Sequence, residues 1–165
     1  MQIFSVENGM TKAWENKAHA SNINQVTCHP TNENQFASVG SDRTLKVWDK
    51  RKDKPVHTER SKVEIINGVF SPDDGNTLVT CNFEEELTFY DPRTWQVVRQ
   101  IKFKNEVDDF MWDKTGSVFF LGDNTGRISL FEGGPSSTKT QASVQLSGVH
   151  ISGRCDCLCM HPDNT

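Results

Sequence analysis

The segment Phe36-Ala-Ser-Val-Gly-Ser-Asp-Arg-Thr-Leu-Lys-Val-Trp-Asp49 decides the fold of this 165-residue chain. Apolar and polar residues alternate up to a Gly-Ser-Asp turn, and a second alternating run then ends in Trp48-Asp49. A period of two is typical of strands, and a tight turn between two such runs makes them antiparallel neighbours. The segment therefore predicts a β-hairpin.

The hairpin is part of a unit that recurs along the chain. In three units a Pro or Asp at the end of an apolar run stands 18 residues before an aromatic residue: Pro30 and Trp48, Pro72 and Tyr90, and Asp113 and Phe131. Successive units are 42 and 41 residues apart, and a fourth begins at Leu158. A period of this length is typical of repeats that each fold into a four-stranded blade of a β-propeller.

Each unit contains four short alternating runs, and no stretch has the 3.6-residue period of a helix. The predicted strands of the first unit are Asn22–Cys28, Gln35–Val39, Thr44–Trp48 and Pro55–Thr58. Those of the second are Glu64–Phe70, Thr77–Cys81, Leu87–Tyr90 and Val97–Ile101. Those of the third are Val107–Trp112, Val118–Leu121, Arg127–Phe131 and Ser143–Leu146. The prediction is an all-β protein.

Four residues of the first unit resemble the signature of the WD-repeat family. In that family a His, a Ser or Thr, a turn Asp and a Trp form a buried hydrogen-bonded set, and the matching positions here are His19, Ser38, Asp42 and Trp48. The resemblance implies that Asp42 orients His19, which links to Ser38 and the indole N–H. Buried polar groups persist where each has a partner.

The same trio of Ser, His and Asp also allows a hydrolase reading. The spacing fits the structural set fully, and the chain has no nucleophile elbow, so we expect no catalytic residue. The later units depart from the pattern. Ser61, Glu84 and Tyr90 take the positions of the set in the second unit, and Thr125 and Phe131 take two of them in the third.

The spacing divides the chain into consecutive parts of one partial propeller. We expect the end of a blade at 1–17, whole blades at 18–60, 61–102 and 103–147, and the start of another at 148–165. This is an arc of about four blades from a seven-bladed ring. An open arc leaves a blade face and strand edges uncovered, so we expect the arc to be completed by further blades or by a second copy.

Composition narrows the function classes. The net charge is −4 and the pI about 5.7, which argues against a general basic surface for nucleic acid. No apolar run approaches 18 residues, and no secretory leader follows Met1. The five cysteines fall in predicted strands rather than in a disulfide framework, which favours a reducing compartment. The expected partners are proteins, not a membrane or a small-molecule substrate.

The run Cys155-Asp-Cys-Leu-Cys-Met-His161 invites a metal-site reading. Alternate residues of a strand share a face, but neighbours on that face lie nearly 7 Å apart, so three in a row do not reach one zinc ion. We expect small residues packed between blades here, and neither a metal nor another cofactor.

Two turns supply the candidate partner-binding residues. Glu84, Glu85 and Glu86 fall between the second and third strands of their blade, and Arg43 lies in the Gly-Ser-Asp turn. The resemblance implies that these turns share a propeller face with the His19 segment. An acidic triplet there suits a basic peptide, although a solvated turn explains the charge equally simply.

Along its whole length the chain is similar to the WD-repeat subunits of the THO transcription–export assembly. The shared pieces include Leu87-Thr-Phe-Tyr-Asp91, Phe103-Lys-Asn-Glu-Val107, Trp112 and Phe119-Phe-Leu121. The resemblance implies a nuclear, non-enzymatic scaffold for messenger RNA packaging and export, which reaches RNA through other subunits. Two alternatives stay open: a WD-repeat adaptor in ubiquitin-ligase substrate recognition or ribosome biogenesis, and an enzyme built on a propeller.

Overall fold

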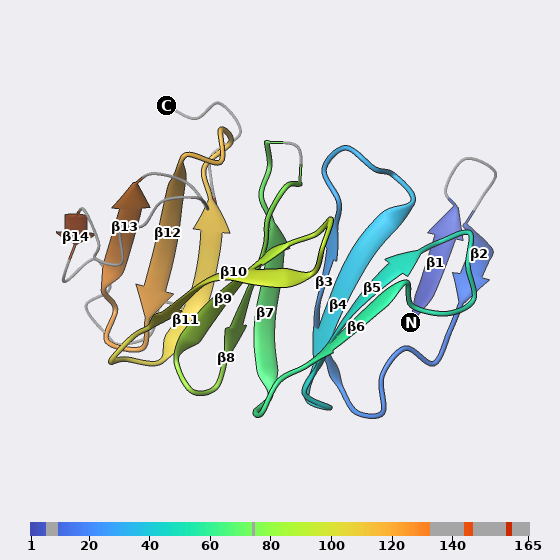
Figure 1. Cartoon of the computed structure of the whole chain (residues 1–165), viewed down its shortest axis with the longest axis horizontal. Coiled ribbons are helices and arrows are strands. Elements are labelled where there is room, and N and C mark those ends of the chain that lie inside the picture. Colours follow the sequence, from blue (N-terminus) through green and yellow to red (C-terminus); the bar gives the residue numbers. More distant parts are fainter. Residues whose placement is uncertain (6–9, 74, 133–143, 147–157, 160–165) are drawn as a thin grey trace.

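The structure is a computed structural model that describes residues 1–5, 10–73, 75–132, 144–146 and 158–159. These residues form fourteen strands and no helix, which confirms the predicted all-β class. Three four-stranded antiparallel sheets and one two-stranded sheet stand side by side as a fan (Figure 1). No helix of the described part of the chain could span a membrane.

The sheets follow one another along the chain. The two-stranded sheet pairs β1 (Gln2–Ser5) with β2 (Thr11–Glu15). Blade 1 consists of β3 (Ile23–Cys28), β4 (Gln35–Gly40), β5 (Thr44–Asp49) and β6 (His57–Arg60). Blade 2 consists of β7 (Ile65–Phe70), β8 (Leu78–Asn82), β9 (Glu86–Asp91) and β10 (Gln96–Lys102). Blade 3 consists of β11 (Val107–Trp112), β12 (Val118–Asp123), β13 (Ile128–Glu132) and β14 (Val144–Leu146).

The predicted strands agree with these bounds to within two residues. The prediction of Pro55–Thr58 is wrong at both ends, because the outer strand of blade 1 runs from His57 to Arg60. Its ladder with β5 extends from the pair His57 and Val47 to the pair Arg60 and Thr44. Proline has no N–H to donate, so Pro55 belongs to the turn before the ladder.

The core lies between the blades. Val39, Leu45 and Val47 of blade 1 pack with Ile65 and Leu78 of blade 2, and all five are at most 2% exposed. A second cluster fills the space between blades 2 and 3. The arc is therefore stabilised by sheet faces buried against neighbouring sheets, which is how propeller blades and other repeats gain their stability.

Polar contacts also join each inner strand to the next. Gln25 Oε1 on β3 accepts the N–H of Gly68 on β7 at 2.9 Å. The Asn67 amide on β7 donates to Asp109 Oδ1 on β11 at 2.7 Å. The other oxygen of Asp109 accepts the N–H of Leu158 at 2.8 Å. These bonds fix the relative height of neighbouring blades.

Candidate protein-interaction sites

The four residues of the predicted hydrogen-bonded set meet in blade 1. His19 Nδ1 lies 2.9 Å from Asp42 Oδ1, and His19 Nε2 lies 2.7 Å from Ser38 Oγ. The Trp48 indole N–H donates to the same Ser38 oxygen at 2.8 Å. A carboxylate only accepts, so Nδ1 carries the imidazole proton and Nε2 accepts from the Ser38 hydroxyl. The chain of bonds thus runs from the turn to the strand β5.

Asp42 holds the far end of this chain. Thr44 Oγ1 donates to its Oδ1 at 2.6 Å, and the Ala20 N–H donates to its Oδ2 at 2.9 Å. Burial would raise the pKa of Asp42, but the hydrogen bonds from Thr44, His19 and Ala20 outweigh burial and hold that pKa well below its usual value. Asp42 is therefore ionised at neutral pH and ties the segment before β3 to the β4–β5 turn.

This geometry does not suit nucleophilic catalysis. Ser38 is 1% exposed, and its oxygen already accepts the Trp48 indole N–H. A nucleophilic serine needs an oxygen that a substrate carbonyl can approach. The hydrogen bonds of the Ser–His–Asp trio therefore have a structural role inside blade 1.

The turns between second and third strands share one backbone form. Arg43, Glu85 and Gly126 occupy the same turn position with φ values of 64°, 58° and 75°. The N–H of each donates to the carbonyl three residues earlier, at 3.0 to 3.2 Å. A type I turn followed by a left-handed residue is a common hairpin connection. Glycine reaches this conformation without strain, whereas Arg43 and Glu85 do not.

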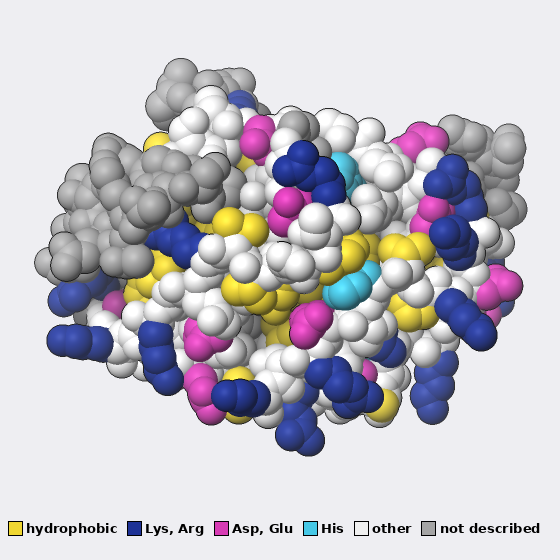
Figure 2. Space-filling model, in the orientation of Figure 1, with side chains coloured by type: hydrophobic (Ala, Val, Ile, Leu, Met, Phe, Trp, Pro, Cys, Tyr) yellow, Lys and Arg dark blue, Asp and Glu magenta, His cyan; other side chains and the backbone are white. Residues whose placement is uncertain are grey.

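These turns lie at the same edge as the links between blades, which are residues 16–22, 61–64 and 103–106. The N–H of Ser41 donates to Asn22 O, and the N–H of Phe83 donates to Glu64 O, at 2.9 and 3.1 Å. This edge is the lower one in Figure 1, and Lys and Arg side chains stand along it with Asp and Glu among them (Figure 2). The surroundings of the acidic triplet are therefore of mixed charge.

The members of the acidic triplet have different surroundings. Glu84 is exposed at the tip of the turn, Glu85 is the left-handed residue, and Glu86 is half-buried at the start of β9. Asn82 Oδ1 accepts the N–H groups of Glu84 and Glu86 at 3.0 and 3.2 Å and so caps the turn. Arg43 is exposed on the corresponding turn of blade 1. Only Glu84 and Glu86 line a common cavity.

Blade 3 replaces the hydrogen-bonded set by aromatic packing. Phe103 stands at the position of His19 and packs edge-on against Phe131, which stands at the position of Trp48, with 5.6 Å between ring centroids. The link is tied by a different polar contact, from the Asn105 amide to Asp123 Oδ2 at 2.7 Å. Thr125, at the position of Asp42, donates its hydroxyl to Asp123 Oδ1. The link thus remains fastened without an imidazole.

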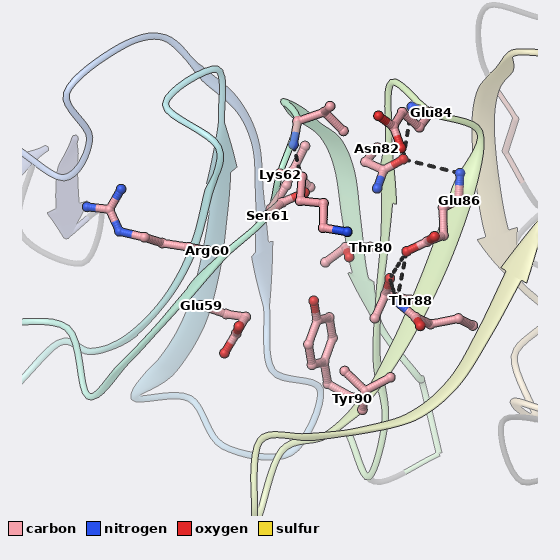
Figure 3. Close-up of a pocket in the computed structure, with 14 residues that line it drawn as sticks. Glu59, Arg60, Ser61, Lys62, Thr80, Asn82, Glu84, Glu86, Thr88 and Tyr90 are labelled. Carbon is pink, nitrogen blue, oxygen red and sulfur yellow. Dashed lines mark hydrogen bonds between the residues drawn. The ribbon is translucent and has the colours of Figure 1, made fainter.

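Blade 2 has neither an aromatic side chain nor an imidazole at the position of His19. Ser61 stands where His19 stands in blade 1, and its Oγ accepts only the N–H of Val63 at 3.3 Å among the described residues. Tyr90, at the position of Trp48, is 6% exposed and bonds to Thr80 and Thr88. A cavity of about 300 Å³ opens above Tyr90, between β6 and the strands of blade 2 (Figure 3).

Comparison with known proteins identifies the repeat. Residues 11–49, which contain the His19 set, match the family described as "WD domain, G-beta repeat". This segment is a WD repeat. A solved structure, "Crystal Structure of Mitotic Checkpoint Complex", superposes with a TM-score of 0.84 over 98% of this chain and 51% of that chain, at 17% identity. The likeness of the two structures confirms the propeller fold.

Curated relatives match the chain over different lengths. THO complex subunit 3 of Arabidopsis thaliana is 27% identical over 98% of this chain and 50% of its own length. WD repeat-containing protein AAC3 of Dictyostelium discoideum is 30% identical over 75% of this chain and 26% of its own length. The chain therefore spans half or less of these relatives.

Most of the segment 155–161, for which a metal site was considered, lies outside the described residues. Cys159 is described, and it is exposed and free. Across residues 1–5, 10–73, 75–132, 144–146 and 158–159, no group of three His, Cys, Asp or Glu side chains is placed to hold a metal ion.

Sequence reasoning missed most of the residues around the blade 2 cavity. Glu59, Thr80, Thr88 and Gln100 belong to no motif, and they lie together only because β6 of one blade faces β8, β9 and β10 of the next. The available signal was the departure from the WD pattern at Ser61 and Tyr90. A small residue replacing the histidine leaves a space at this position in the repeat.

Proposed function

We propose that this WD-repeat chain is a non-catalytic protein-interaction scaffold of a nuclear assembly that packages and exports messenger RNA. The observation that carries the proposal is the similarity to THO complex subunit 3 of Arabidopsis thaliana, which extends over 98% of the chain. It includes blades 2 and 3, which lack the hydrogen-bonded set of blade 1. Departures from a repeat pattern are more specific to one protein than the pattern itself.

The charge and the surface agree with this role. The net charge of −4 suits contact with RNA through other subunits rather than directly. The blade faces are buried against one another, so partners dock on the turns, the links and the outer strands. Exposed apolar side chains occur on β10, where Val97 and Val98 are 51% and 58% exposed. Outer strands of this kind accept partner segments by shape and apolar contact.

The proposal is tested by purifying the tagged full-length protein from nuclease-treated nuclear extract and identifying its partners by mass spectrometry. We expect the other THO subunits in stoichiometric amounts. Recovery of a ubiquitin ligase or a ribosome-assembly machine without any THO subunit would overturn the proposal and leave the propeller fold intact.

A charge-reversal variant sharpens the test. Glu84→Lys with Glu86→Lys changes two side chains at the edge of blade 2, and we expect it to reduce recovery of one subunit. Glu33→Lys, exposed in the β3–β4 turn at the opposite edge, is the matched control. An unchanged complex with the first variant would remove the acidic turn from the binding surface.

A further inference from the structure

The cavity of blade 2 has a polar floor and a wall from each of two blades. Tyr90, Thr80 and Thr88 form the floor and are between 4% and 6% exposed. Gln100 of β10 lines the cavity. Glu86 stands on β9 of blade 2, and Glu59 stands on β6 of blade 1 (Figure 3). A volume of about 300 Å³ is at the lower end of the range for ligand-binding clefts. The space therefore suits one side chain or a small group rather than a large molecule.

Blade 1 shows what this position holds when it is filled. There the His19 imidazole lies between the turn carboxylate of Asp42 and the buried hydroxyl of Ser38, and it touches each through one ring nitrogen. Blade 2 keeps a hydroxyl floor and carboxylates, but Ser61 provides no ring. The repeat thus places acceptors around a position that, in this blade, no ring occupies.

The carboxylates of the cavity are oriented but not neutralised. Glu86 Oε1 accepts the Gln100 amide at 2.8 Å and the Thr88 hydroxyl at 3.3 Å, and Oε2 accepts no hydrogen bond from the described residues. Burial raises the pKa of Tyr90, and the charges of Glu59 and Glu86 raise it further. Glu59 Oε2 is 3.6 Å from His57 Nε2.

Two cationic residues also border the cavity. In Figure 3 the Arg60 side chain points away from the floor, whereas Lys62, which is exposed on the link, extends its ammonium toward Thr80. Neither forms an ion pair with Glu59, Glu84 or Glu86 within the described part of the chain. Three carboxylates therefore border the cavity against two cationic side chains, an excess of one negative charge.

We infer that this cavity binds an arginine side chain of a partner protein. A guanidinium carries five donors in a planar fork, so it can donate to the free oxygen of Glu86 and to a second acceptor of the cavity at the same time. The planar fork adds geometric specificity to these charge-assisted bonds, which favours arginine over a point-charged ammonium. The inference rests on the proposed function, since it gives the chemistry of one partner segment of the scaffold.

The test uses Tyr90, which is the only tyrosine of the chain, as a reporter inside the cavity. The chain is labelled with ¹³C-tyrosine and titrated with the blocked tripeptide Gly-Arg-Gly, and then with the same peptide carrying citrulline, lysine or glutamate. We expect the ring signal of Tyr90 to shift saturably with arginine. The neutral isostere citrulline should bind at least about tenfold more weakly, because a hydrogen bond to a charged group is lost.

Variants separate the cavity from the rest of the surface. Glu86→Gln and Glu59→Gln should each weaken arginine binding by about tenfold or more, and Glu33→Gln at the opposite edge should not. Ser61→His should abolish binding by placing an imidazole in the cavity. Arginine and citrulline binding equally well, the glutamate peptide shifting Tyr90 instead, or no shift with arginine would each overturn the inference.

The outcome is distinguishable from the test of the proposed function. If the arginine peptide fails to bind while THO subunits co-purify, the cavity inference is lost and the scaffold proposal stands. If the peptide binds as expected but no THO subunit is recovered, the cavity stands and the assignment to an export assembly is lost.

Discussion

The side-chain amide of Asn67 donates a 2.7 Å hydrogen bond to the carboxylate of Asp109 across the boundary between blades 2 and 3. Asp109 also accepts the backbone N–H of Leu158 with its other oxygen. One carboxylate therefore connects its own inner strand to residues on both sides. This arrangement sets the height at which the blades meet.

Asp109→Ala should lower the free energy of unfolding by about 1–3 kcal/mol, because Asn67 and Leu158 N–H lose an ionised acceptor. Urea unfolding followed by tryptophan fluorescence measures the change. Asn67→Ala and the double variant complete a cycle in which the two losses should not add, since the residues share one bond. Strict additivity in the cycle would show that the Asn67–Asp109 bond contributes nothing.

Trp48→Phe should destabilise the chain by about 1 kcal/mol or more, because the variant keeps an aromatic ring but removes the indole N–H that Ser38 accepts at 2.8 Å. Thermal unfolding provides the measurement. Trp95→Phe is the matched control, since Trp95 stacks on His57 and is half-buried near the rim. Equal losses in the two variants would mean that ring size matters here and the hydrogen bond does not.

Asp42 should make stability depend on acid pH. Its folded-state pKa is held below the unfolded value, so its contribution is fully present above about pH 4 and is lost as pH falls through the folded pKa. Asp42→Asn should flatten this part of the curve and lower stability at pH 7. The check is a series of urea unfolding curves between pH 7 and pH 2, and the same slope in both proteins would contradict it.

Tyr90 should titrate as a single buried phenol. Burial, together with the charges of Glu59 and Glu86, raises its pKa above the usual value of about 10. A raised folded pKa gives a contribution that is present below pH 10 and lost as pH rises further. Absorbance at 295 nm should show one transition above pH 10 in the folded chain and near pH 10 in urea. A folded-state midpoint at or below 10 would be inconsistent with a buried hydroxyl.

The cysteines of blades 1 and 2 should differ in reactivity. Burial raises the pKa of the Cys81 thiol to about 12, whereas Cys28 is exposed on β3. The thiolate is the reactive form, so iodoacetamide at pH 8 should modify Cys28 and spare Cys81 until the chain unfolds. Peptide mapping by mass spectrometry distinguishes the two sites, with urea-treated protein as the positive control. Modification of Cys81 in the folded chain would place that strand outside the core.

The strands and the repeat could be predicted because both depend on local alternation and spacing. The cavity could not, because it is created by what is missing at Ser61 and by side chains from two blades that are distant in sequence. The caps at Asn82 and Asp123 were also missed. They occupy the position that Gly40 has in blade 1. The turn therefore keeps its shape in blades 2 and 3, where a side-chain oxygen at this position accepts the N–H groups of the turn. A comparison of repeats position by position reveals such exchanges only once the turns are superposed.

The cavity above Tyr90 belongs to two blades at once, with Glu59 on one and Glu86 on the other. A molecule that occupies it must therefore favour the arrangement in which these blades are correctly docked. Binding and docking then form a single linked equilibrium. A bound partner would raise the melting temperature of the arc. A distant mutation that loosens the contact between blades 1 and 2 would weaken binding of the partner without contacting it.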